Sequence, residues 1–389
     1  MELSLGASRL VVKHVGSRAD LCTLCRVNKE FQRAAERALY NTIYASDVWD
    51  TFGMCSLFAR TPRLAAIVEN LTLFVGDEDD SDSRPQLEVC LPNDFWPTVS
   101  EALHQTTRLR FLNLHLENAG DPAQAWILNG TAFRLRSFHC DLQWDGHLVS
   151  FLNTQTDIHD LYIVDYSEDT AQTSTSVSSP LDPGALPNLS TLECTFAEAA
   201  CALAPTRPIS RLKTCFSKTR PLEKREELLL LFSKLIETTH PLRSLDIADS
   251  SYSDWFSMEL LASVVRLQSQ VHDLHYLGTL VLPIDGHVVR SSVSVGRCLL
   301  THFFKRLKFY GLLRSLSSLE CVEVDISEWE PSPRIPAGVR ALVSELRLYC
   351  PSLQQVIFVN DFERTVIVAS HGTYTIDCES NTENMWREF

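Results

Sequence analysis

A short pattern of apolar residues recurs along the chain, with the form apolar-x-x-apolar-x-apolar. Its last two apolar positions alternate with a period of two, so their side chains share one face of a β-strand. We therefore predict a series of short strands, each burying one face, that begin 23 to 45 residues apart. Weaker copies begin at Leu212 and Leu274, and the clear copies are Val68/Leu71/Leu73, Leu109/Leu112/Leu114, Leu135/Phe138/Cys140, Ile158/Leu161/Ile163, Leu189/Leu192/Cys194, Leu242/Leu245/Ile247, Leu319/Val322/Val324 and Leu353/Val356/Phe358.

Amphipathic helical patterns lie between the copies. In one of them, Leu228, Leu231, Phe232 and Leu235 have the i, i+3, i+4, i+7 spacing of a buried stripe. Alternating strands and helices predict a parallel sheet with right-handed crossovers. The predicted helices are Phe95–Gln105, His147–Gln155, Glu223–Thr239, Asp254–Gln270, Arg297–Leu316 and Pro336–Cys350.

The strand–helix series resembles a degenerate leucine-rich repeat, because each copy supplies one strand and one helix. Ordinary leucine-rich repeats have periods of about 20–29 residues, so this array is irregular. Pro187, Pro241 and Pro351 each stand just before a copy, where proline ends a helix and sets an extended backbone. The predicted fold class is α/β: an irregular leucine-rich-repeat-like solenoid with a parallel sheet and outer helices.

The predicted repeat domain covers residues 46–364, with insertions at 76–84 and 168–184. The first insertion is acidic, the second is rich in Ser, Thr, Asp and Pro, and Glu330–Pro336 is predicted to be a proline-rich turn. Residues 365–389 form a further segment, in which Thr365–Ser370 and Thr373–Asp377 predict a hairpin around His371-Gly372 that caps the last repeat.

Composition narrows the class of protein. Hydrophobic residues make up 45% of the 389 residues and charged residues 22%, close to soluble globular averages. No run approaches the ~18 apolar residues of a membrane span, and Met1–Val15 lacks the apolar centre of a secretory signal. The net charge of −14 disfavours bulk nucleic-acid binding. We expect a cytoplasmic or nuclear protein that binds neither membrane nor nucleic acid.

The sequence offers little catalytic or metal chemistry. The 12 cysteines are scattered through apolar patterns, where free Cys behaves as a small buried hydrophobe. Neither Cys22/Cys25 nor His272/His275 has a second pair at zinc-site spacing. Phosphate-binding glycine loops, zinc-protease motifs and nucleophile elbows are absent from the sequence. We expect no enzyme activity, no cofactor and no metal.

The first 45 residues differ from the rest. They carry seven basic and four acidic residues in an otherwise acidic chain. A helix is predicted over Asp20–Asn28 with Asp20 as its cap, and a second helix over Lys29–Tyr40. Ile43 and Tyr44 follow as a short extended piece.

The run D-L-C-T-L-C-R-V-N-K-E-F-Q-R-A-A-E-R-A-L-Y resembles the second half of an F-box, as found in fungal F-box proteins with leucine-rich-repeat-like bodies. The matching positions are Asp20, Leu21, Leu24, Val27, Lys29 and Phe31. The resemblance implies that residues 1–45 form a partial F-box-like segment that docks a Skp-type adaptor of a cullin–RING ubiquitin ligase. The residues that would then contact the adaptor are Leu21, Leu24, Val27, Lys29 and Phe31. The usual Leu-Pro opening is missing, so the first helix is expected to be short.

Three hypotheses follow. In the first, the chain is a non-enzymatic substrate receptor that binds the adaptor through residues 1–45 and an unknown target protein through the repeats. In the second, it is a repeat scaffold with no ligase role, and residues 1–45 only cap the array, since a Leu/Val/Phe stripe is also typical of ordinary core. In the third, the chain is a fragment whose start lies upstream. The sequence also leaves open one curved sheet or two halves divided near 168–184.

Overall fold

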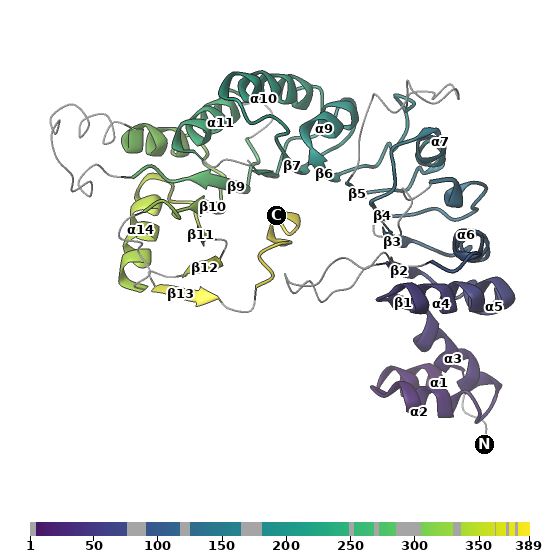
Figure 1. Cartoon of the computed structure of the whole chain (residues 1–389). Helices are drawn as coiled ribbons and strands as arrows, with labels where there is room; N and C mark the ends of the chain where they lie inside the picture. The colour runs from purple at the N-terminus through teal and green to yellow at the C-terminus, as the bar shows by residue number, and fades with distance from the viewer. Residues whose placement is uncertain are drawn as a thin grey trace. The chain divides into compact units, whose positions relative to one another are not determined.

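The computed structural model describes residues 5–75, 91–116, 125–164, 181–248, 253–267, 272–284, 305–329, 336–361, 363–370, 373–377 and 380–389. The chain divides into two compact units, Met1–Leu189 and Ser190–Phe389. The boundary falls just after the second predicted insertion. Each unit is α/β, and in each the helices that follow the strands lie on one side of them (Figure 1).

The first unit begins with three helices and continues as strands joined by helices. Its strands β1 to β5 pair in sequence order, and every pair is parallel. In chain order the elements are α1 (Leu5–Lys13), α2 (Arg18–Leu24), α3 (Lys29–Tyr40), β1 (Thr42–Ala45), α4 (Val48–Arg60), α5 (Pro62–Ala65), β2 (Asn70–Phe74), α6 (Phe95–Gln105), β3 (Phe111–His115), the 3-10 helix η2 (Ala125–Leu128), β4 (Ser137–Cys140), α7 (Gly146–Thr154) and β5 (Asp160–Ile163).

The second unit repeats the strand–helix order and ends in an antiparallel hairpin. Strands β6 to β11 are parallel, β12 pairs antiparallel with β11, and β13 pairs antiparallel with β12. Its elements are β6 (Thr191–Phe196), α9 (Ala197–Leu203), β7 (Arg211–Cys215), α10 (Pro221–Leu235), β8 (Ser244–Ala248), α11 (Asp254–Arg266), β9 (Tyr276–Val281), a helix over 305–313, β10 (Cys321–Asp325), α14 (Pro336–Tyr349), β11 (Gln355–Asn360), β12 (Glu363–Ser370), β13 (Thr373–Asp377) and the 3-10 helix η3 (Met385–Arg387).

The predicted parallel sheet and most of the predicted elements are confirmed. Helices α6 and α3 have the predicted bounds, and the hairpin forms and pairs with the last parallel strand. The predictions at 76–84, 168–180, 297–304, 330–335 and 371–372 lie outside the described residues. The helices α4, α5 and α9, which the sequence analysis missed, complete the strand-to-strand connections.

The apolar triplets stack in register from strand to strand. In the first unit Leu71 pairs with Leu112, which in turn pairs with Phe138, and all three are at most 2% exposed. The residue that opens each triplet, such as Leu109 or Leu135, is fully buried beneath the strand. The second unit has an equivalent row, formed by Leu192, Leu212, Leu245, Leu277, Val322 and Val356.

A shared backbone acceptor fixes this register at the start of strands β2 to β5 and β7 to β11. The amides of Glu69 and Asn70 both donate to the carbonyl oxygen of Asn41, and those of Arg110 and Phe111 both donate to that of Glu69. The same fork recurs in both units, so successive strands begin at equivalent points. The other accepting carbonyls belong to Arg110, Arg136, Ser190, Ser210, Arg243, His275 and Glu320.

One predicted copy was placed wrongly. The strand-forming triplet near Leu212 is Ile209/Leu212/Thr214, so it begins three residues earlier than predicted. Thr214 takes the inward position, where an apolar residue is expected, and is 1% exposed. Its hydroxyl lies 3.4 Å from the Cys194 sulfur, a buried hydrogen bond that lets a polar group sit there.

Replacing Leu112 by alanine should lower the free energy of unfolding by about 2–5 kcal/mol, because it opens a cavity in the stacked row. The matched control is Thr72→Ala on the neighbouring strand, whose side chain lies on the other face of the sheet and should change stability by less than about 0.5 kcal/mol. Equilibrium urea unfolding measures both. Equal losses for the two variants would contradict the inward assignment.

Candidate partner-binding surfaces

The three N-terminal helices have a small hydrophobic core of their own. Ser17 caps α2 by accepting from the Asp20 amide, so the prediction of Asp20 as the cap was wrong. Asn28 caps α3, accepting from the amides of Glu30 and Phe31 at 3.0 and 2.9 Å. The two caps start the helices at fixed points and so set which side chains meet. The buried core consists of Val12, Leu21, Phe31, Ala34, Ala35 and Leu39.

The structure divides the five residues that the resemblance assigns to the adaptor. Leu21 and Phe31 are 7% and 8% exposed and belong to this core, and Leu24 is half-buried against it. Val27, at 58% exposure, and Lys29 face outward. Leu21 and Phe31 therefore hold the helices together, while Val27 and Lys29 are free to meet another surface.

Helix α1 adds exposed apolar residues that sequence reasoning missed. Ser8 and Val12 are buried one turn apart, which fixes the face of α1 that meets the core. Leu10 lies on the opposite face and is 62% exposed, and Val11 is 44% exposed. Leu10 could have been identified from its position midway between Ser8 and Val12, because a residue two positions away lies about half a helical turn around the helix.

Ion pairs join α3 to the first strand–helix unit. The Arg63 guanidinium donates to both oxygens of Glu36, which also accepts from Gln32. The hydrogen bond from Arg63 lowers the pKa of Glu36 despite its burial. Arg37 donates to Glu69 at 2.8 Å.

A basic groove of about 450 Å³ runs beside these contacts, between α1 and α3. Arg9 and Lys13 line it from α1, and Arg33 and Arg37 line it from α3. Glu69 is the acidic residue in its lining. The groove therefore carries much of the positive charge of the first 45 residues.

The outward face of the first sheet carries aromatic and histidine side chains. The Phe74 ring stacks on His115 with centroids 4.5 Å apart, and Tyr44 lies 5.9 Å from Phe74. His139 meets the edge of the Tyr162 ring at 5.9 Å and pairs with an acidic residue, Asp160. Sheet faces opposite the helices usually carry polar residues, so this row is a candidate contact surface.

The outward face of the second sheet carries a row of charges. Lys213 pairs with Glu193 at 3.2 Å, and Arg364 donates to Glu323 at 3.3 Å. Asp246 lies beside Gly278 on the next strand. A Cβ at Gly278 would lie 2.4 Å from a carboxylate oxygen of Asp246, so glycine makes room for this charge.

These charges surround a polar cavity of about 220 Å³, closed by Thr382, Glu383 and Asn384. Burial raises the pKa of Glu323, and the nearby Asp246 charge raises it further, while Arg364 acts in the opposite direction. The Tyr276 hydroxyl donates to Glu323 at 3.1 Å. Because Glu193, Lys213, Glu323 and Arg364 already form ion pairs, we interpret the cluster as a paired network.

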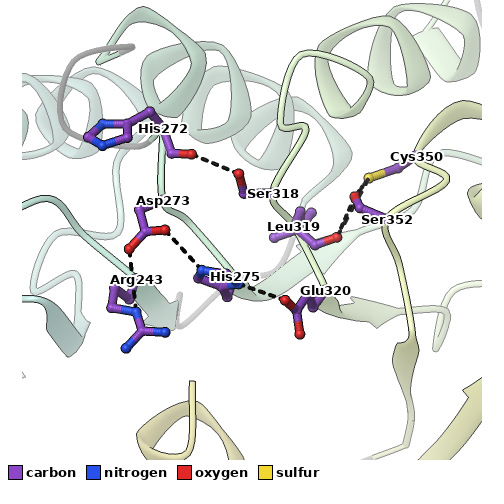
Figure 2. Close-up of polar contacts among 9 residues, drawn as sticks. All are labelled: Arg243, His272, Asp273, His275, Ser318, Leu319, Glu320, Cys350 and Ser352. Carbon is purple, nitrogen blue, oxygen red and sulfur yellow. Dashed lines mark hydrogen bonds and ion pairs between the residues drawn. The ribbon is translucent and has the colours of Figure 1, made fainter.

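His275 links two successive strands at their starting ends (Figure 2). One ring nitrogen lies 2.9 Å from Glu320 and the other 3.1 Å from Asp273, which also pairs with Arg243 at 3.5 Å. Both contacts are hydrogen bonds at once only when the ring carries two protons. His272 does not join them; its carbonyl oxygen accepts from Ser318 at 2.8 Å. The two histidines therefore serve separate contacts between neighbouring strand–helix units.

None of the described cysteines forms a disulfide, and five of them, Cys55, Cys140, Cys194, Cys321 and Cys350, are buried. Burial raises the pKa of Cys55, Cys140 and Cys194 to about 12, which disfavours the nucleophilic thiolate. Cys25 packs at the edge of the N-terminal core, while Cys22 is exposed. Within the described ranges, no three His, Cys, Asp or Glu side chains gather closely enough to hold a metal ion.

Comparison with models of protein families and with curated proteins finds no match for this chain. Among the described helices, none is long and apolar enough to cross a membrane.

The raised pKa of Glu323 predicts a stability that falls as the pH rises. A carboxyl that holds its proton more tightly in the folded chain supports folding fully below its ordinary pKa of about 4.3 and loses that support as the pH passes the raised value. Glu323→Gln should therefore make the dependence of unfolding free energy on pH less negative. Glu36→Gln is the matched control with opposite sign, because the lowered pKa of Glu36 supports folding above its ordinary value. Urea unfolding over a pH series measures both slopes, and equal changes of slope would contradict the assignment.

Proposed function

We propose that the chain is an F-box-type substrate receptor of a cullin–RING ubiquitin ligase. Its three N-terminal helices would dock a Skp-type adaptor, and its strand–helix series would bind a target protein. The observation that carries the proposal is the separate core of α1 to α3, which leaves Leu10 and Val27 exposed at 62% and 58%. Large apolar residues held outward on a small helical unit fit a partner surface.

The adaptor contact in this proposal comes from the exposed residues. It is formed by Leu10, Val11, Val27, Lys29 and the half-buried Leu24. Leu21 and Phe31 set the helix packing that presents these residues. Helix α1 spans nine residues, in keeping with the short first helix expected because the Leu-Pro opening is missing. A small interface depends on a few well-packed anchors, so two exposed side chains can decide the affinity.

The rest of the chain is proposed to be an irregular leucine-rich-repeat-like solenoid. The in-register triplets and the repeated amide forks support it, because both recur once per strand–helix unit. A receptor of this kind acts by proximity: it holds the target near a separate enzyme and raises its effective concentration. No residue of this chain is assigned a chemical step.

A second candidate is a repeat scaffold in which residues 1–45 cap the array and bind no adaptor. The ion pairs Arg63–Glu36 and Arg37–Glu69 favour it, because they fasten α3 to the first strand–helix unit. Both candidates predict that removing residues 1–45 lowers stability. They differ only in whether an adaptor binds.

Charge substitutions on the exposed face test the first candidate. Leu10→Asp and Val27→Asp should each reduce co-purification of a Skp-type adaptor at least about tenfold, since 1.4 kcal/mol of lost contact is a factor of ten. Thermal unfolding should stay close to that of the unchanged chain, because both side chains are already exposed. Leu230→Asp on α10, a residue 53% exposed in the second unit, is the matched control and should keep the adaptor bound.

Absence of the adaptor from the unchanged chain would overturn the receptor proposal and leave the scaffold. Equal adaptor recovery with and without residues 1–45 would overturn the assignment of the contact to these helices.

A further inference from the structure

Part of the outward face of the sheet in the second unit is buried beneath a segment that contains the short 3-10 helix η3. The alternation that turns Leu277, Val322 and Val356 toward the helices puts Tyr276, Cys321 and Ile357 on the opposite face. Tyr276 is 1% exposed, and Cys321 and Ile357 are fully buried. The cover is the segment 380–389, which lies against this face on the side away from α10 and α11 (Figure 1).

Two kinds of contact hold segment 380–389. Met385 and Trp386, at 2% and 0% exposure, pack in a cluster with Tyr276, Cys321, Ile357 and Val366. Arg387 donates to Glu193 at 2.5 Å, while the Lys213 ammonium lies 5.9 Å from the Trp386 ring centroid. On this face the Trp386 ring therefore packs against Tyr276 and aliphatic side chains, and the Arg387 guanidinium pairs with a carboxylate.

The fit of the segment is incomplete. The Trp386 indole nitrogen is buried and has no hydrogen-bond partner among the described residues, which weakens the packing. The cavity of about 220 Å³ remains between its residues 382–384 and the charged row. The regular secondary structure of the segment is the three-residue 3-10 helix η3.

We propose that this face is a receptor groove for a protein segment carrying tryptophan followed by arginine, and that segment 380–389 is its resident occupant. A partner with this chemistry competes with the chain's own segment for Glu193 and the pocket of Tyr276, Cys321 and Ile357. The inference goes beyond the adaptor contact and concerns the other unit. Its test contains no adaptor, so either proposal can fail alone.

The direct test is binding of a labelled peptide with the sequence of residues 380–389 to the full chain. In the unchanged chain the attached segment acts at an effective concentration of the order of millimolar, so micromolar peptide binds poorly. Trp386→Ala in the chain should vacate the pocket and tighten peptide binding at least about tenfold. Trp49→Ala is the matched control, because Trp49 is 69% exposed on α4 in the first unit. Equal peptide binding by all three chains, or none by the Trp386→Ala chain while it remains folded, would overturn the proposal.

A charge exchange keeps the test decisive if Trp386→Ala fails to fold. Glu193→Arg in the full chain should release Arg387. The groove should then bind a peptide with Arg387→Glu at least about tenfold more tightly than the natural peptide, because the charges of one ion pair are reversed. The natural peptide with Trp386→Ala should bind neither chain. A Glu193→Arg chain that binds both charged peptides equally, or neither, would contradict recognition at Glu193.

Discussion

Parallel strands of four to six residues each bury little surface, so their pairing is stable only where the inward side chains of one strand align with those of the next. In both units two kinds of contact fix this alignment. At the start of strands β2 to β5 and β7 to β11, two consecutive amides donate to the carbonyl of the residue just before the preceding strand, and the apolar triplets then stack directly upon one another. Every inward position is thereby used for core packing. In our proposals, recognition is carried by side chains that face outward and by the segments 5–29 and 380–389.

Much of the fold follows from this constraint, which is why the sequence predicts it well. Leu112 and Leu245 repeat at fixed offsets from the residues that open their triplets, and this spacing alone predicts a strand. The prediction fails where chemistry departs from the pattern. Thr214 satisfies its hydroxyl inside the core and so hides one triplet, and Ala45 is too small for the strand β1 to be read as another copy.

The candidate sites were less predictable, because exposure depends on contacts that a linear pattern does not contain. Phe31 and Val27 fit the same family motif, yet one lies in a core and the other in solvent. The sequence around Leu10 does not show that this leucine is exposed. Its exposure follows only from the structure, in which Ser8 and Val12 are on the buried face of α1. Trp386 stands in a polar stretch, and nothing nearby in the sequence indicates that Tyr276, some 110 residues earlier, forms its pocket.

We propose that the chain is a binding protein whose two units carry different recognition chemistry: exposed apolar residues beside a basic groove in the first, and a buried tryptophan site beside the Glu193 carboxylate in the second. Hydrogen–deuterium exchange of the full chain with and without a Skp-type adaptor tests this most directly, because it maps contacts without changing any residue. We expect slower exchange across residues 5–28 on adding the adaptor, and unchanged exchange in α10. Identical exchange over residues 5–28 in both samples, at saturating adaptor, would contradict the adaptor-docking role.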